Sequence, residues 1–225
     1  AGTFTGQQSV CQNPGTFDLT TLLSGQDAGG VWTDASGNTI TNLVEVTALT
    51  AGLQTFTYTV TNPCGEDQEE VRLQINPLPV MNASNISVAS PICAGSAATI
   101  SVSGMIDGNY TITYDLEGAN VSTGHSATLV VQGGTGSVII PANQIPNEGI
   151  SGVVIHTIQN TDTQCQSILN MVRANFTVIP VPTFAGATLT ATSVCLGNDI
   201  QISISGATDI ANGTYIFGYE LSGAA

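Results

Sequence analysis

A module of about 100 residues is written twice in this chain, and this repeat constrains the fold more than any other feature. The segment ISVSG at residues 100–104 returns as ISISG at residues 202–206, and residues 110–119 return at residues 215–224. The offset is 102 residues through the glycine and 105 residues from the tyrosine onward, so the second copy has three more residues in the turn between them. A period of this size is that of a whole domain rather than of a solenoid turn. We therefore expect the chain to be part of a tandem array of domains.

Proline marks the expected boundaries between domains. The segments Pro77-Leu78-Pro79 and Pro180-Val181-Pro182 lie 103 residues apart, and each follows a segment of alternating apolar and polar residues. Pro-x-Pro favours extended polyproline geometry, which gives a short, semi-rigid spacer. The sequence predicts domains at residues 1–77 and 78–180 and the N-terminal part of a third, incomplete repeat at residues 181–225, arranged end to end.

Alternation with a period of two predicts half-buried antiparallel strands. The expected inward faces are Tyr110, Ile112, Tyr114 and Leu116 in the second domain and Tyr215, Phe217, Tyr219 and Leu221 in the third. Further strands are expected at residues 56–61, 71–75, 99–103, 127–132, 152–158 and 175–179. Helix is nearly absent, and residues 17–23 would form one turn at most. Short β-branched strands separated by turn residues predict an all-β fold of tandem immunoglobulin-like (Ig-like) β-sandwich domains.

The charge balance narrows the classes of partner. Sixteen acidic residues stand against two arginines and no lysine, for a net charge of −14. Such a chain cannot neutralise phosphates, so we expect no nucleic acid partner and no attraction to anionic lipid. Its 42% of hydrophobic residues exceeds what disordered acidic chains carry. No apolar run approaches the roughly 18 residues that cross a bilayer, and the amino terminus lacks the basic region of a signal peptide, so no direct membrane insertion is expected.

Five cysteines divide two, two and one over the three units. From the repeat we predict intradomain disulfides Cys11–Cys64 and Cys93–Cys165, with Cys195 at the position of Cys93 and its partner missing. Such bridges imply an oxidising compartment. Closing loops of about 54 and 73 residues would stabilise each domain by roughly 4 kcal/mol in the chain-entropy model. The alternative is that the cysteines are reduced and buried. No Cys-x-x-Cys spacing occurs, which argues against zinc binding and thioredoxin-like chemistry.

The first domain has a distinctive order of turn and strand residues. CQNPG stands at residues 11–15, DLTTLLSG at 18–25, DAGGVWTD at 27–34 and TFTYTV at 55–60. This order resembles Ig-like repeats in very large surface proteins of Bacteroidota, among them SprB-type gliding-motility adhesins exported by the type IX secretion system. The second and third units look like domain-sized repeats of the same proteins. The resemblance extends over essentially the whole chain, contains no active-site motif, and implies surface location and adhesion or filament formation.

Few residues are candidates for binding or catalysis. Trp32, the only tryptophan, is the candidate ligand-binding residue because its ring could stack on a sugar; filling the first core is its alternative role. Asp107, or Asp115 with Glu117 on one strand face, could supply oxygen ligands to calcium, although no EF-hand-type loop is present.

Three other segments are expected to be structural. The acidic run at residues 66–70 reads as a solvated hairpin turn. GHS at residues 124–126 lacks the G-x-S-x-G elbow, so neither His125 nor His156 is expected to be catalytic. GGTG at residues 133–136 opens onto a strand-like segment rather than a helix, which predicts a turn and not a dinucleotide fingerprint.

The sequence thus predicts a non-enzymatic structural segment, the stalk of a large repetitive adhesin or filament at the extracellular cell surface, related to gliding motility through the resemblance. Expected partners are neighbouring repeats of the same chain, surface polysaccharide or like filaments, and no cofactor is expected other than calcium. Three alternatives stay open: a polysaccharide-binding Ig-like module, accessory domains of a secreted enzyme, and a filament in which a neighbouring chain completes the third domain by strand donation.

Overall fold

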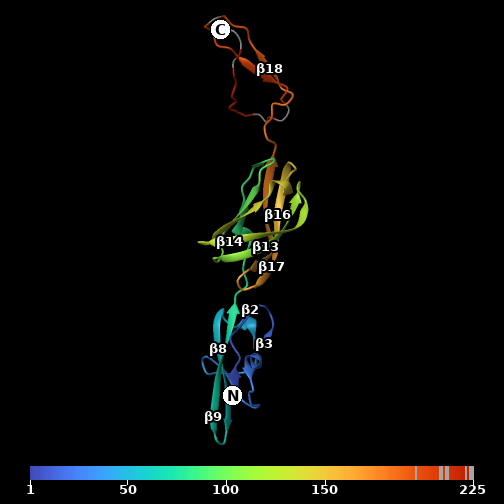
Figure 1. Cartoon of the computed structure of the whole chain (residues 1–225). Helices are drawn as coiled ribbons and strands as arrows, with labels where there is room; N and C mark the ends of the chain where they lie inside the picture. Colours follow the sequence, from blue (N-terminus) through green and yellow to red (C-terminus); the bar gives the residue numbers. More distant parts are fainter. Residues whose placement is uncertain (196, 208–209, 211–212, 221, 223–225) are drawn as a thin grey trace.

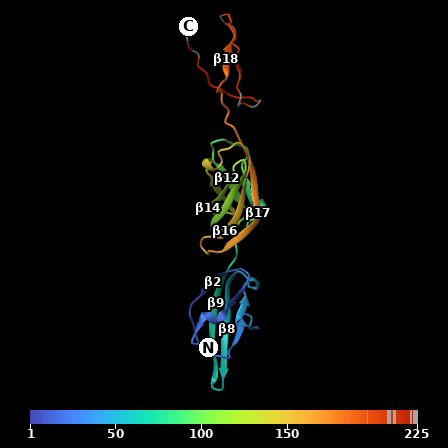
Figure 2. The same ribbon diagram turned by 90° about the vertical axis from the view of Figure 1, so that its right-hand side faces the viewer.

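The structure, a computed structural model, describes residues 1–195, 197–207, 210, 213–220 and 222. Two β-sandwich units lie end to end, and a third segment with a short hairpin follows them (Figures 1 and 2). Helical structure in the described part is limited to single 3-10 turns: η1 (Leu19–Leu22), η2 (Val46–Ala48), η3 (Ala83–Asn85) and η4 (Ala142–Gln144). The fold is therefore all-β, a tandem of Ig-like domains.

The first unit is built on a five-stranded sheet in the order β2-β9-β8-β5-β6, with the small pairs β3-β7 and β1-β4 beside it. Its longest strands, β8 and β9, form an antiparallel hairpin in which Asn62 pairs with Gly65 at the turn and Gly52 pairs with Ile75 at the other end. The strands are β1 (Thr3–Phe4), β2 (Gln8–Cys11), β3 (Thr16–Asp18), β4 (Leu23–Ser24), β5 (Val31–Asp34), β6 (Thr39–Ile40), β7 (Leu43–Glu45), β8 (Gly52–Asn62) and β9 (Gly65–Asn76).

The second unit is larger, and its strands form one continuous sheet in the order β10-β12-β15-β14-β13-β16-β17-β11. The long strand β14 joins the two halves, because Val131 pairs with Gly108 of β13 and with Gly136 of β15. The strands are β10 (Ile86–Val88), β11 (Ile92–Cys93), β12 (Ala98–Ser103), β13 (Gly108–Gly118), β14 (Ser122–Gln132), β15 (Thr135–Ile140), β16 (Gly149–Asn160) and β17 (Gln166–Ile179).

Each unit has its own core, built from the inward residues of alternating strands. In the first unit Val71, Leu73 and Ile75 of β9 are fully buried, as their period of two predicts. In the second, the predicted inward face of β13 is confirmed: Tyr110, Ile112, Tyr114 and Leu116 are all buried. The two clusters divide at the proline-containing linker, since the last residue of one is Ile75 and the first of the other is Met81.

Both units place a short strand parallel to their last strand. In the first, β2 runs parallel to β9 and Cys11 lies opposite Asn76. In the second, β11 runs parallel to β17 and Cys93 lies opposite Ile179. Asn76 and Ile179 directly precede Pro77 and Pro180. Each of these cysteines therefore lies at the end of its unit where the chain leaves for the next unit.

The third segment begins as the second unit does. Its two strands, β18 (Thr188–Ala191) and β19 (Ile202–Ser205), pair antiparallel with Leu189 opposite Ile204, and β10 pairs with β12 through Ile86 opposite Val102. The two strand pairs occupy matching places in the repeat.

The predicted inward strand face of the third unit is wrong for this structure. Tyr215, Phe217 and Tyr219 form no strand and are 41%, 43% and 64% exposed, and Leu221 lies outside the described residues. The corresponding strand of the second unit, β13, is held between β14 and β16. The described part of the third segment offers only β18 and β19, and these strands pair with each other, so residues 215–220 have no flanking paired strands of the kind that hold β13.

Candidate functional site

The junction between the two units is the most distinctive site in the described structure. A disulfide joins Cys11 of the first unit to Cys165 of the second, with the two Cα atoms 5.4 Å apart and 154 residues apart in sequence. Cys11 ends β2, and Cys165 directly precedes β17 in the turn that follows β16. The sulfur pair thus connects facing poles of successive domains.

The predicted Cys11–Cys64 disulfide is wrong. Cys64 lies in the turn that begins β9, whereas Cys11 lies opposite Asn76, where β9 ends. Twelve strand residues at a rise of about 3.4 Å each place the two cysteines roughly 37 Å apart. A disulfide needs Cα atoms within roughly 7 Å, so the two cysteines lie at opposite poles of the unit and cannot be bridged.

The predicted Cys93–Cys165 disulfide is wrong for the same reason. Cys165 precedes the first residue of β17, and Cys93 lies opposite Ile179, its last residue. A strand of 14 residues separates them by roughly 44 Å. Cys64, Cys93 and Cys195 are free and exposed, which also corrects the alternative of buried, reduced cysteines.

A second contact supports the junction. The linker that follows β9 passes against the second unit, where the Ser167 hydroxyl donates a hydrogen bond of 2.6 Å to the Pro79 carbonyl. Ser167 lies two residues after Cys165, so the disulfide and this hydrogen bond hold neighbouring points of the same strand. Two covalent connections, the linker and the disulfide, therefore join the units and limit how far one can bend against the other.

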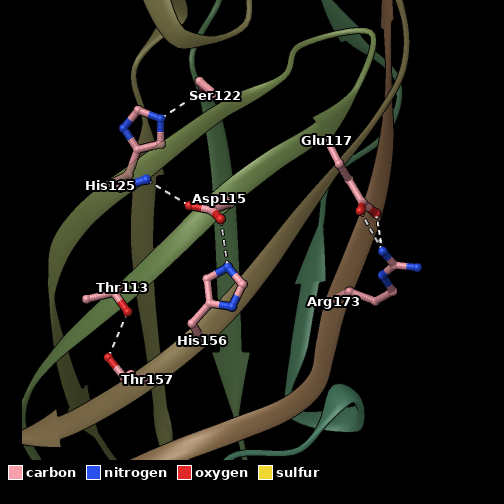
Figure 3. Close-up of polar contacts among 9 residues, drawn as sticks. Thr113, Asp115, Glu117, Ser122, His125, His156, Thr157 and Arg173 are labelled. Atoms are coloured by element: carbon pink, nitrogen blue, oxygen red, sulfur yellow. Dashed lines mark hydrogen bonds and ion pairs between the residues drawn. The ribbon is translucent and has the colours of Figure 1, made fainter.

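A row of polar pairs crosses the outer face of the second unit (Figure 3). The hydroxyls of Thr113 on β13 and Thr157 on β16 are 2.7 Å apart. Further along β13, the Asp115 carboxylate lies 2.9 Å from Nε2 of His156 on β16. These contacts tie adjacent strands together on the solvent side.

The row ends in an ion pair between β13 and β17. The Arg173 guanidinium donates to both carboxylate oxygens of Glu117, at 2.5 and 2.6 Å. Glu117 reaches β17 across Gly152, where a Cβ atom would come within 2.8 Å of its Oε1. Because both charged side chains are two-fifths or more exposed, we assign the pair about 0–1 kcal/mol.

The candidate calcium ligands are not brought together. Asp107 accepts hydrogen bonds from the backbone N–H groups of Gly133 and Gly134 at 3.0 and 2.8 Å, which lower the pKa of its carboxyl. Asp115 accepts from the Gly124 N–H at 2.7 Å, the main cause of its lowered pKa, and its second oxygen faces His156. With Glu117 bound to Arg173, each carboxylate already has protein partners. In the part of the chain that is described, no group of three or more acidic, histidine or cysteine side chains forms a metal site.

Both histidines have polar partners within the second unit, His156 in Asp115 and His125 in Ser122. His125 stacks on Tyr114 with ring centroids 5.2 Å apart, and its Nε2 lies 2.8 Å from the Ser122 hydroxyl. The Asp115 carboxylate is engaged by Gly124 and His156 rather than by the His125 ring. A serine and a histidine without an orienting acid do not make a triad.

The expectation that Trp32 binds a ligand is wrong for this structure. Trp32 is only 5% exposed and packs in the first core, with its ring centroid 4.9 Å from that of Tyr58. A sugar needs an open ring face, and the Trp32 ring is buried in the first core cluster. Tyr58 in turn donates to the Asp27 carbonyl at 2.7 Å and accepts from the Gly30 N–H at 3.0 Å. The tryptophan is therefore a core residue.

Of the two segments that were expected to be turns, residues 133–136 contain a turn, whereas residues 66–70 belong to strand β9 and the prediction of a turn there is wrong. Gly133 and Gly134 connect β14 to β15 with positive φ values of 58° and 74°, so they belong to a hairpin rather than to a nucleotide-binding loop. The acidic run at residues 66–70 lies on β9 directly after the β8–β9 turn, and the residues are exposed apart from the half-buried Glu69. Within the described residues, no helix has the length and apolar character to span a membrane.

Comparison with known proteins shows no family for this chain. No family model matches the chain, and no curated protein matches it. Among solved structures, the titin I-band fragment I67-I69 aligns with 89% of this chain and 73% of its own at 11% identity and a TM-score of 0.42. Sidekick-1 immunoglobulin domains 1-5 align with 84% of this chain and 42% of their own at 12% identity and a TM-score of 0.23. The N-terminal four Ig domains of Dscam1 isoform 1.9 align over 78% and 44%, at 12% identity and a TM-score of 0.27.

Proposed function

We propose that this chain is a stalk segment of a large repetitive cell-surface protein, an adhesin or filament of the kind found in Bacteroidota, with a mechanical rather than a catalytic role. The observation that carries the proposal is the Cys11–Cys165 disulfide between successive Ig-like units. A bridge of this kind forms in an oxidising compartment, which fits a protein outside the cytosol.

The position of the bridge gives it a mechanical consequence. Tension applied along the chain enters through residues 1–11, crosses the sulfur pair and leaves through β17. Residues 12–164 lie inside the closed loop and carry none of the end-to-end load once the flanking segments are straight. Most of both cores is therefore protected from complete extension, which is the property that a load-bearing stalk requires.

The surface fits the same role. The net charge of −14 with no lysine makes neighbouring stalks repel one another, most strongly at low ionic strength. The alternative of a polysaccharide-binding module loses the residue that motivated it, because Trp32 is buried.

Two measurements test the proposal. Antibodies raised against residues 1–180 should label intact source cells in electron micrographs, and the label should lie along surface fibres and disappear when the gene is deleted. The parent reading frame should contain further copies of the module. Labelling confined to the cell interior, or a reading frame in which these units flank a catalytic domain, would contradict a stalk.

A further inference from the structure

Cys93 occupies in the second unit the place that Cys11 occupies in the first. Each ends a short strand that runs parallel to the last strand of its unit, opposite the residue that precedes the linker proline. The residue after each cysteine makes the same backbone hydrogen bond: the Gln12 N–H donates to the Asn76 carbonyl and the Ala94 N–H to the Ile179 carbonyl, both at 2.8 Å. The two cysteines thus have equivalent backbone settings, yet Cys11 is bridged and Cys93 is free.

Cys64 and Cys165 form a second equivalent pair. Both lie in the turn between the last two long strands of their unit, β8–β9 and β16–β17. Both turns open with an asparagine whose Oδ1 accepts backbone N–H groups, from Cys64 at 2.8 Å in the first unit and from Asp162 at 2.9 Å in the second. Cys165 is bridged and Cys64 is free and exposed.

We call Cys11 and Cys93 strand cysteines and Cys64 and Cys165 turn cysteines. The one complete junction in the described chain therefore joins the strand cysteine of one unit to the turn cysteine of the following unit. We propose that Cys93 is a covalent cross-linking site for the turn cysteine of the next copy of this module, and that Cys64 receives the strand cysteine of a preceding copy. We class Cys195 as a strand cysteine as well. The Asn198 N–H donates to the Cys195 carbonyl at 3.1 Å, and the Ser96 N–H donates to the Cys93 carbonyl at the same distance. Pairing of each strand cysteine with the turn cysteine of the next unit then accounts for all five cysteines.

The bridge forms by thiol–disulfide exchange with a small disulfide oxidant such as glutathione disulfide. The Cys93 thiolate attacks one glutathione sulfur, which gives a mixed disulfide and releases one glutathione thiolate. The turn cysteine thiolate of the next copy then attacks the Cys93 sulfur and releases the second glutathione. Two protein thiols lose two electrons and two protons, and one glutathione disulfide becomes two glutathione thiols.

The consequence is a chain of overlapping loops. Cys93 lies inside the segment closed by Cys11 and Cys165, so a bridge from Cys93 to the next copy would close a second loop that shares residues with the first. A unit in such an array would be tied to both neighbours by disulfides as well as by linkers. The inference rests on the tandem arrangement of the units. It does not depend on whether the protein lies at the cell surface.

The test supplies the missing partner within the chain itself. A variant with residues 77–179 duplicated in place runs from residue 1 to 179, repeats 77–179 and continues with 180–225, which restores a Pro-x-Pro junction between the copies. It is folded in a glutathione redox buffer, denatured, alkylated and weighed by intact mass spectrometry. The added copy brings two cysteines, and we expect free thiols at Cys64, at Cys195 and at Cys93 of the second copy.

Two matched substitutions identify which copy supplies the bridge. With Cys93→Ser in the first copy, the turn cysteine of the second copy loses its partner, so the alkylated mass should show one more free thiol. With Cys93→Ser in the second copy, a free thiol is removed and the mass should show one fewer. Bridging within one copy would give the reverse pattern, and an unbridged or glutathione-capped Cys93 in the first copy would equally overturn the proposal. Cys64→Ser is the control, since it should remove one thiol and change no bridge.

Discussion

Replacing Cys11 with serine should change the fully extended length of the chain by a predictable amount. Cys11 and Cys165 are 154 residues apart in sequence and 5.4 Å apart in space. A stretched chain spans about 3.5 Å per residue, so the bridge hides about 540 Å of contour length. In single-molecule force spectroscopy of a chain held at both ends, Cys11→Ser should lengthen the final extension by this amount.

Other cysteine pairings predict other lengths. A Cys11–Cys64 bridge would enclose 53 residues and hide only about 190 Å. Because Cys64 is free, Cys64→Ser is the matched control and should leave the extension unchanged. A gain near 190 Å, or no gain at all, would refute the load path described above. In solution, the lost loop closure should lower the free energy of unfolding by about 5 kcal/mol in the chain-entropy model.

Three further changes test the cores and the turn. Trp32→Ala should cost about 3–5 kcal/mol of unfolding free energy in denaturant titration, because it empties the centre of the first core; a loss under 1 kcal/mol would argue for a surface role. Gly30→Ala should cost about 1–3 kcal/mol, because the new Cβ would overlap the Tyr58 ring, whereas an unchanged melting temperature would mean that this contact is not made in solution. The carboxyl of Asp107 has a pKa lowered from 3.8 in the folded state, so its stabilising contribution is present above pH 3.8 and is lost as the pH falls through the folded pKa. Asp107→Asn should therefore make the melting temperature less dependent on pH below about 4. An unaltered dependence of the melting temperature on acid pH would contradict the turn geometry.

The all-β fold could be predicted from the sequence because the alternation of apolar and polar residues is a local signal. Alternation along residues 110–116 specifies one buried face, and the structure buries Tyr110, Ile112, Tyr114 and Leu116. The same alternation at residues 215–221 gave a wrong prediction, because a strand face is buried only where neighbouring strands cover it. A period of two predicts which side chains share a strand face. It does not predict whether neighbouring strands are present to bury that face.

The disulfide pairing could not be obtained by counting cysteines per unit. Pairing within each domain assumed that two cysteines of one domain lie near each other, whereas β9 and β17 hold them at opposite poles. The sequence did contain a usable signal. Cys64 precedes Pro77 by 13 residues and Cys165 precedes Pro180 by 15, which places both in the turn one strand before a boundary. A turn at one pole faces the preceding unit, and the linker at the other pole faces the following one.

The polar contacts on the second unit were only partly predictable. Asp115 and Glu117 were expected on one strand face, and their side chains do lie on the outer side of β13 (Figure 3). Their partners, His156 and Arg173, come from strands 41 and 56 residues away in sequence, so the pairing depends on the register of the sheet. Charge pattern alone could therefore suggest a calcium site where the structure has hydrogen bonds and an ion pair.

The most direct test of the central claim is a non-reducing peptide map of the intact chain. After free thiols are blocked and the protein is digested without reductant, mass spectrometry should find the peptide that contains Cys11 joined to the peptide that contains Cys165. Cys64, Cys93 and Cys195 should carry the blocking group. A Cys11–Cys64 or Cys93–Cys165 cross-link in the folded protein would contradict a covalent junction between successive units and, with it, the mechanical account.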